Sequence, residues 1–376
     1  MNILIINPLL YTPKAKGAPV HKLSTIKHTM IYNYALGFTQ LGHRVTIIAS
    51  DEYRPTQPEQ YEVEMVFLPN IAKKAIQRWP NGFPILGGLW SYVRRNRNKY
   101  DLIIASETFT QQAFVAAMLA PAKSVIWQEM HHHSPHLHGI PSRIWHGIVV
   151  KHLFSGKVKF VARSQAAKAF IARYSKNVSD IIIDHGVNID NFSTVTQKRK
   201  QFVVVANLFD YKRVDEIIDK FAKFIAKYDN TYKLYLAGDG EMRQKLEQQV
   251  GELSIAENVV FCGFLSHQDL SRIVGESQAS LVRTVKDLNM VSIPETLACA
   301  TPILTNTTPL LANYIAETGM GIAKPDWNED DIQTMVANNA EFVDNCIKHH
   351  YELSSKYRAE LMIKIFNDNN ENSADK

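Results

Sequence analysis

The chain has 376 residues, of which 45% are hydrophobic and 21% charged, a composition typical of a globular protein rather than a disordered or fibrous one. Its length predicts about two domains. The cysteines are odd in number and widely spaced (Cys262, Cys299 and Cys346), which excludes a disulfide scaffold and fits a reducing compartment. No apolar run approaches the roughly 20 residues of a membrane span, and residues 1–6 lack the basic region of a signal peptide, so a cytoplasmic protein is expected.

Charge is unevenly distributed along the chain. Residues 1–200 contain 25 Lys and Arg against 11 Asp and Glu, a balance of +14. Residues 201–376 contain 17 against 26, a balance of −9. Opposite charges indicate two domains with different partners, although chance alone also produces such differences.

Short runs of Val, Ile and Leu alternate with longer amphipathic stretches, a pattern typical of parallel strands that are buried on both faces and joined by helices. A helix is expected to end before Gly42, because glycine readily adopts the left-handed conformation of a helix C-cap. The strands expected in the first half are Asn2–Ile6, Val45–Ala49, Glu62–Leu68, Leu102–Ala105, Ser124–Trp127, Lys159–Ala162 and Asp180–Ile183.

The polar segment Asn191–Lys200 lacks periodicity and is predicted to be a linker, after which the alternation restarts. The strands expected there are Phe202–Val205, Lys233–Ala237, Val259–Cys262, Ser280–Arg283 and Thr301–Leu304, and helices include Val214–Lys227 and Arg243–Leu253. Only helices are expected beyond Asp330, and the polar tail Asn367–Lys376 is predicted to be disordered. The sequence thus predicts an α/β protein with two doubly wound sheets, in domains 1–195 and 196–376. The final helices are candidates to pack back on the first domain.

A phosphate-binding site is expected after the strand Phe202–Val205. A nucleoside diphosphate needs backbone N–H donors at a helix N-terminus and a nearby cation. Lys212 and Arg213 lie at the start of the next helix, where cations are disfavoured by the helix dipole. That placement favours a ligand-binding role over the alternative of solvated surface charge.

Two acids, Asp287 and Glu295, are candidate sugar contacts. A polar loop follows the strand that ends near Arg283, and Pro294 suits the first turn of a helix that carries Glu295. Carboxylates accept hydrogen bonds from sugar hydroxyls. Such a pair is also common on solvated surfaces, so the spacing alone leaves both interpretations open.

The second half resembles the retaining glycosyltransferases of family 4, also called glycosyl transferases group 1, which have the GT-B fold. The segments that carry the resemblance are Tyr235–Val250, Glu257–Leu270, Glu295–Thr305 and, before the linker, Ile181–Phe192. The likeness extends weakly over LGHRVTIIAS and VARSQAAKAFI. It implies two Rossmann-like domains that face an interdomain cleft, with an acceptor on the first and a nucleoside-diphosphate sugar on the second. It also implies transfer with retention, without a metal or a cofactor.

The resemblance assigns roles residue by residue. Glu295 would hold the donor ribose, Asp287 the donor hexose and Lys212 the diphosphate, with Lys212 and Asp287 also catalytic. Backbone around Gly263 would border the base. The complete donor-binding set is Asn207, Lys212, Arg213, Gly263, Phe264, Leu265, Asp287, Leu288, Asn289, Met290, Val291 and Glu295.

Four positions depart from the family pattern. They are Asp287 in place of Glu, Asn207 in place of Arg, Asn289-Met290 in place of Phe-Gly, and Ala300 in place of Gly. The missing arginine removes a positive charge from the leaving group, and Arg213 is a candidate to restore it. These departures leave a non-catalytic nucleotide-sugar-binding subunit open as an alternative, and a phosphorylase or an epimerase can share the same fold.

Five histidines follow the expected strand Ser124–Trp127, namely His131, His132, His133, His136 and His138. The family places a histidine at the end of this strand, facing the donor sugar. His131 is the predicted catalytic histidine, and His132 and His133 are alternatives. Five imidazoles can also bind a transition metal, but no acid or cysteine completes a defined spacing, so no metal site is predicted.

Aromatic and basic residues are interleaved between residues 73 and 99. They are Trp79, Phe83, Trp90 and Tyr92 with Lys73, Lys74, Arg78, Arg94, Arg95, Arg97 and Lys99. They suggest contact with an anionic membrane, whereas the alternative is an aromatic core with a solvated basic rim; nucleic acid is not an expected partner. We therefore expect a hexose-type transfer to a glycan or lipid-linked hydroxyl acceptor in cell-surface polysaccharide or glycolipid assembly. The inner face of the plasma membrane is one candidate location.

Overall fold

The computed structural model describes residues 1–10, 25–72, 84–154, 156–184, 186–287 and 289–374. The chain divides into two compact units, which we call the N-terminal unit (Met1–Asn188 with Ser354–Lys376) and the C-terminal unit (Ile189–Leu353). The division falls after Asn188 rather than after residue 195, because the start of the expected linker packs within the C-terminal unit. There, the Val195 N–H donates to the Cys299 carbonyl at 3.4 Å.

A parallel sheet forms the centre of the N-terminal unit, and its six described strands lie in the order β3-β2-β1-β4-β5-β6. The strands are β1 (Asn2–Ile6), β2 (Arg44–Ser50), β3 (Glu64–Leu68), β4 (Leu102–Ser106), β5 (Ser124–Gln128) and β6 (Lys159–Ala162). The helices are α1 (Met30–Gln40), α3 (Leu89–Asn96), α4 (Gln111–Leu119), α5 (Ile140–Ile144), the π-helix η5 (Trp145–Leu153), α6 (Gln165–Ile171) and α14 (Ser355–Ala374).

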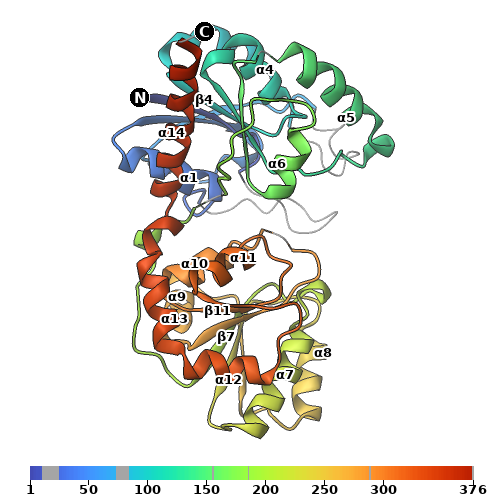
Figure 1. Ribbon diagram of the computed structural model, residues 1–376, viewed down its shortest axis with the longest axis vertical. Coiled ribbons are helices and arrows are strands. Elements are labelled where there is room, and N and C mark those ends of the chain that lie inside the picture. The colour runs from blue at the N-terminus through green and yellow to red at the C-terminus, as the bar shows by residue number, and fades with distance from the viewer. Residues whose placement is uncertain (11–24, 73–83, 155, 185, 288, 375–376) are drawn as a thin grey trace. The chain divides into compact units, whose positions relative to one another are not determined.

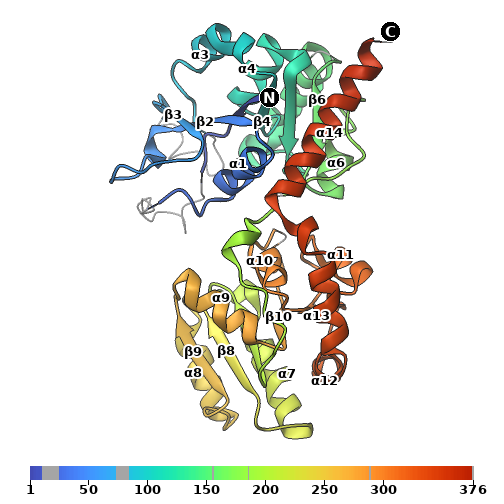
Figure 2. The same ribbon diagram turned by 90° about the vertical axis from the view of Figure 1, so that its left-hand side faces the viewer.

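Alternate side chains of the strands pack into two opposite layers, as expected for a sheet covered on both faces. Ile3 and Ile5 of β1 join the core that includes α1 and α14, and Leu4 and Ile6 join the core that includes α3 and α4. Helix α14, the red helix beside α1 in Figures 1 and 2, contains the last residues of the chain yet belongs to this unit.

The C-terminal unit repeats this architecture, and the six strands described in it lie in the order β12-β11-β10-β7-β8-β9. The strands are β7 (Gln201–Val205), β8 (Lys233–Ala237), β9 (Val259–Gly263), β10 (Ala279–Val282), β11 (Ile303–Thr305) and β12 (Gly321–Ala323). The helices are α7 (Val214–Lys227), α8 (Arg243–Glu252), α9 (His267–Glu276), α10 (Ser292–Ala298), α11 (Ala312–Thr318), α12 (Glu329–Ala337) and α13 (Asn339–Lys348). In Figure 1, α7, α8 and α12 cover one face of this sheet, and α9 and α10 lie on the other. The two sheets confirm the predicted fold class.

Two local expectations were wrong, and one strand was missed. Asp180–Ile183 is not a strand, because this stretch meets β6 only through separate hydrogen bonds, including one from Ile183 N–H to the Ala162 carbonyl at 3.0 Å. The strand β12 was not expected. The polar tail is helical as far as Ala374, since adding residues to an existing helix costs far less than starting one.

Each sheet reverses its strand order beside the first strand of its unit. Strand β1 lies between β2 and β4, and β7 lies between β8 and β10. At such a switch point the connections leave two neighbouring strands in opposite directions, so a crevice opens at their carboxyl ends. The loops after β7 and β10, and after β1 and β4, are therefore the natural positions for ligand-binding residues.

Candidate functional site

Lys212 and Asp287 meet at the switch point of the C-terminal sheet. Lys212 ends a short 3-10 turn after β7 (Asp210–Lys212), and Asp287 lies in the loop after β10. Lys212 is only 7% exposed, and its Nζ forms a salt bridge with the Asp287 carboxylate. Two residues that the sequence analysis assigned to one donor are thus in direct contact.

The loop that carries Asp287 is braced by side chains that the sequence analysis did not single out. Thr284 is fully buried, and its hydroxyl donates to the Tyr211 carbonyl at 3.1 Å and accepts from the Asp287 N–H at 3.1 Å. The Asn306 side chain binds both the N–H (3.2 Å) and the carbonyl (2.8 Å) of Thr284. The sequence did not reveal this arrangement, because Tyr211 and Asn306 come from loops that follow other strands.

Glycines allow the loops after β7 and β8 to approach each other closely. A Cβ at Gly238 would lie 1.9 Å from the Ala206 carbonyl oxygen, and one at Gly240 would lie 2.5 Å from that of Leu208. Both distances are too short for any side chain. The Ala-Gly-Asp-Gly stretch that contributes to the family resemblance therefore has a steric function, which is to hold the loop before Lys212 in place.

Arg213 lies next to Lys212 but is already neutralised. Its φ of 47° is left-handed, and its guanidinium lies 2.6 Å from Glu216 and 3.5 Å from Asp215, both in the first turn of α7. Asn207 is half-buried in the same loop, and its carbonyl accepts from the Phe209 N–H at 2.8 Å.

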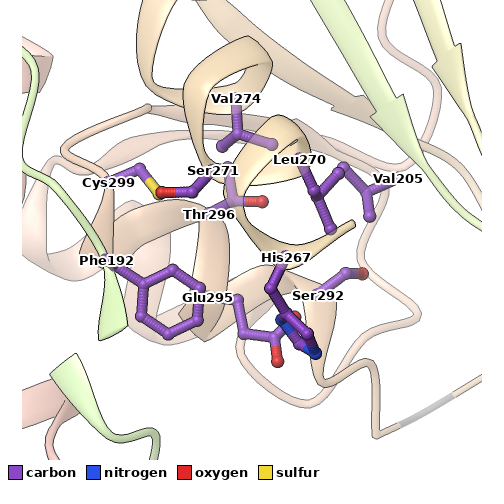
Figure 3. Close-up of a pocket in the computed structure, with 10 residues that line it drawn as sticks. All are labelled: Phe192, Val205, His267, Leu270, Ser271, Val274, Ser292, Glu295, Thr296 and Cys299. Carbon is purple, nitrogen blue, oxygen red and sulfur yellow. The ribbon is translucent and has the colours of Figure 1, made fainter. Parts of the chain in front are cut away.

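Glu295 lies on α10 and lines a pocket within the C-terminal unit. The pocket residues are Phe192, Val205, His267, Leu270, Ser271, Val274, Ser292, Glu295, Thr296 and Cys299. In Figure 3 the Glu295 carboxylate and the His267 ring turn toward the same side of this pocket. Burial raises the pKa of Glu295 to about 7, so the carboxyl group changes its charge near neutral pH.

The other predicted donor residues lie around the ends of β9 and α10. Gly263 adopts a φ of 66°, and its carbonyl accepts from the Gly238 N–H at 2.8 Å. Phe264 and Val291 are exposed, Leu265 and Asn289 are half-buried, Met290 is buried, and Leu288 lies outside the described residues.

Ala300, which follows α10, adopts a φ of 54°. Glycine takes this conformation without strain, so the alanine at this position is strained.

The N-terminal switch point contains a buried acid that sequence reasoning missed. Glu107 directly follows β4, has a φ of 59° and is 6% exposed. Its carboxylate accepts hydrogen bonds from the backbone N–H groups of Glu129 (2.8 Å) and Met130 (3.2 Å), and Glu129 pairs with Arg163 at 2.5 Å. Burial, followed by the nearby Glu129 charge, raises the pKa of Glu107 to about 7.

The histidines after β5 differ in their surroundings. His131 and His132 are exposed, whereas both ring nitrogens of His133 are occupied, by the Ser142 hydroxyl at 3.1 Å and the Tyr174 hydroxyl at 2.9 Å. The catalytic assignment of His131 stays a prediction. Within the described ranges, no group of three or more His, Cys, Asp and Glu residues is placed to hold a metal ion.

Buried His146 was not singled out by the sequence analysis. Its ring bonds to the Thr108 hydroxyl at 2.9 Å and to the Ser142 carbonyl at 2.7 Å. Burial is the main cause that lowers its pKa to about 4, so the ring is neutral at pH 7.

The predicted membrane surface is only partly described. Trp90 is 41% exposed, and Arg94, Arg95, Arg97 and Lys99 are exposed. Lys73, Lys74, Arg78, Trp79 and Phe83 lie outside the described residues. In the part of the chain that is described, no helix is both long and apolar enough to cross a bilayer.

Comparison with known sequences gives glycosyltransferases. The chain is 21% identical over 202 residues to alpha-monoglucosyldiacylglycerol synthase of Streptococcus pneumoniae, a match that covers 45% of this chain and 46% of the relative. It is 26% identical over 110 residues to N-acetyl-alpha-D-glucosaminyl L-malate synthase of Bacillus anthracis, which covers 29% and 28%. The chain therefore spans less than half the length of these curated relatives.

Solved structures share the fold across nearly the whole chain. A glycosyltransferase from Rickettsia africae has a TM-score of 0.66 at 12% identity and covers 98% of both chains. Anabaena HepE in complex with UDP has a TM-score of 0.59 at 15% identity and covers 100% of both. At these identities the likeness establishes the fold alone.

Two family models match adjacent parts of the sequence. Glycosyltransferase Family 4 matches residues 28–191, and Glycosyl transferases group 1 matches residues 188–346. Together these matches cover most of the chain, and they agree with the two parallel sheets and with the structural neighbours. This chain belongs to the group 1 glycosyltransferases of the family 4 type, which have the GT-B fold.

Proposed function

We propose that this protein is a retaining glycosyltransferase that moves a hexose-type sugar from a nucleoside-diphosphate sugar to a hydroxyl acceptor, with no metal and no cofactor. The observation that carries the proposal is the salt bridge between buried Lys212 and half-buried Asp287 at the switch point of the C-terminal sheet. Ligands of open α/β sheets bind at such points. A lysine ammonium has three donors, so Lys212 can serve Asp287 and a phosphate oxygen together.

The chemistry would depend on stabilising the leaving group. As the bond between the anomeric carbon and the phosphate oxygen breaks, negative charge accumulates on the diphosphate, and Lys212 would stabilise it. Arg213 is paired with Glu216, so the main cationic contribution in this loop is assigned to Lys212. The acceptor oxygen forms its new bond on the same sugar face, and its proton passes to the departing phosphate.

The relatives suggest the setting of the reaction. One is named for the synthesis of a glucosyl glycolipid, and structures of Anabaena HepE contain UDP and UDP-glucose. We therefore propose cell-surface polysaccharide or glycolipid assembly, with a glycan or lipid-linked acceptor at the inner face of the plasma membrane. UDP sugars are the first donors to test.

The decisive experiment combines thermal shift against nucleoside diphosphates and their sugars with NMR of the product. We expect a stabilising nucleotide, a product that keeps the anomeric configuration of the donor, and full activity in EDTA. Inversion would contradict the proposal, as would activity that EDTA removes and a divalent ion restores. Nucleotide binding without transfer would identify a binding subunit, whereas free sugar phosphate or an epimerised donor would identify a phosphorylase or an epimerase.

A further inference from the structure

One helix of the N-terminal unit presents apolar residues to solvent. Helix α5 continues directly into the π-helix η5 after β5, and α5 is labelled at the edge of its unit in Figure 1. Ile140, Ile144 and Ile148 are 55%, 55% and 56% exposed. Because residues four apart lie on one face of a helix, these isoleucines form a continuous apolar stripe, which we call the isoleucine stripe.

The opposite face of the same helix is buried and more polar. Ser142, His146 and Val150 are each offset by two residues from the stripe, and they are 1%, 1% and 2% exposed. A surface helix normally turns its polar face to water, and here the polarity is reversed. Exposed apolar stripes of this kind mark interaction surfaces.

The stripe is held on a fixed element. The Trp145 indole N–H donates to the Thr108 carbonyl at 2.8 Å, and His146 bonds to the Thr108 hydroxyl at 2.9 Å. Just before α5, Leu137 has a φ of 48° and is 60% exposed. A left-handed leucine is unfavourable, and this turn adds one more apolar side chain at the start of the stripe.

All the Asp, Glu, Lys and Arg residues in the surrounding sequence are basic ones. Residues 130–179 contain no Asp or Glu but eight Lys and Arg. Arg143 and Lys151 on this helix are exposed, and no salt bridge to either occurs among the described residues. An apolar stripe with a cationic rim is complementary to one surface chemistry, a bilayer with anionic headgroups.

We propose that the isoleucine stripe inserts into the interfacial region of an anionic membrane while Arg143 and Lys151 contact headgroup phosphates. A second copy of the chain is a poorer occupant, because a two-fold contact brings the same basic rim face to face with itself. This inference rests on the proposed function, which includes a membrane location, and it adds which residues make the contact. Its test uses no sugar donor, so failure of the stripe and failure of glycosyl transfer are seen separately.

The stripe differs from the arginine surface at residues 94–97 in its response to salt. A purely electrostatic contact is released by about 0.5 M salt, where the Debye length falls to a few ångströms. Apolar insertion is not screened. Binding through the stripe therefore leaves a residual fraction on the vesicles at high salt.

The test is sedimentation of the full chain with vesicles of phosphatidylcholine, alone or mixed with phosphatidylglycerol. We expect binding to mixed vesicles, and Ile144→Ser with Ile148→Ser should weaken it by about tenfold or more. The matched control is Leu253→Ser with Ile347→Ser, which removes apolar side chains that are 38% and 41% exposed in the C-terminal unit. This control should bind like the parent.

A probe locates the inserted residue without relying on affinity. Ile148→Cys in a Cys262→Ser background leaves only the buried Cys299 and Cys346 as other thiols, and an environment-sensitive dye on residue 148 should shift to the blue on mixed vesicles. The same dye on Leu253→Cys should not shift. Unchanged circular dichroism establishes that the double serine variant is folded.

Three results would overturn the inference. They are no vesicle binding by the parent chain, equal binding by the parent and the Ile144→Ser/Ile148→Ser variant, and a dimer in sedimentation velocity that this variant dissociates. The last result would assign the stripe to a second copy of the chain instead.

Discussion

The two units share one strand order but differ in the chemistry of their switch points. In the C-terminal unit, a buried cation and an acid from two loops form the Lys212–Asp287 pair. In the N-terminal unit, the corresponding loop carries buried Glu107, whose carboxylate binds backbone N–H groups of the loop after β5. The first arrangement has a cation suited to a phosphate, and the second braces a loop.

This difference shows that the strand order sets where a site can form, whereas the loop residues set what it binds. The two halves of the sequence also differ in charge, with a balance of +14 for residues 1–200 and −9 for residues 201–376. Lys212 is buried although it lies in the acidic half of the chain, so its position is more informative than that of an exposed cation in the basic half.

The largest expected effect comes from removing the cation of the C-terminal switch point. Lys212→Ala should weaken binding of the cognate nucleoside diphosphate by about 1.5–3 kcal/mol, because one hydrogen bond to a charged group is lost. That corresponds to roughly tenfold to over a hundredfold in Kd. Calorimetric titration measures it, with Lys227→Ala, an exposed lysine paired with Asp330, as the control. An unchanged Kd in a folded variant would make Lys212 a structural cation only.

A second prediction separates the two acids of the C-terminal unit. The pKa of Glu295 is about 7, so the ionised fraction of its carboxyl group rises about tenfold between pH 6 and 8. The affinity for the nucleoside diphosphate without its sugar should rise with it, by up to about tenfold. Glu295→Gln should reduce this rise, and the part that remains belongs to the second ionisation of the terminal phosphate. Asp287→Asn should retain diphosphate binding and lower turnover of the sugar donor. If both variants weaken bare diphosphate equally at every pH, the separate roles are wrong.

A third prediction concerns Glu107. Its folded-state pKa is raised from 4.5 to about 7, so the folded state binds more protons than the unfolded state between these values. Its contribution to stability is complete below pH 4.5 and is lost as the pH rises through 7, on the order of 3 kcal/mol. The difference in Tm between Glu107→Gln and the parent should therefore favour the variant more at pH 8 than at pH 5. A pH-independent Tm difference would show that Glu107 does not titrate in this range.

The smallest expected effect tests the other basic surface of the N-terminal unit. Each arginine near an anionic membrane contributes at most about 1 kcal/mol, reduced by screening. Replacing Arg94, Arg95 and Arg97 with alanine should weaken vesicle binding by about tenfold at low salt and very little at about 0.5 M salt. Replacing Lys220, Lys227 and Lys324 of the C-terminal unit is the control. Equal losses in both triple variants would mean that net charge, and not this surface, drives binding.

Much of the fold was predictable because its signals are local. Buried parallel strands are short apolar runs, and helix α7 was predicted with its observed bounds, since apolar side chains recur at intervals of three and four residues along it. The strand prediction failed at Asp180–Ile183, where an apolar run lies beside β6 without a continuous ladder. Composition cannot distinguish these cases, because a strand is defined by its partner's hydrogen bonds.

The sequence by itself determined the two-sheet architecture, the family and the residue types available at each strand end. Only the tertiary structure decided that Lys212 contacts Asp287 and that burial raises the pKa of Glu295 and Glu107. It also decided that both ring nitrogens of His133 form hydrogen bonds, with the hydroxyls of Ser142 and Tyr174. The physical reason is that periodicity reports how a residue lies relative to its own helix or strand. Ion pairs and desolvation depend on distances between groups that are far apart in the chain, and these exist only after the sheets have assembled.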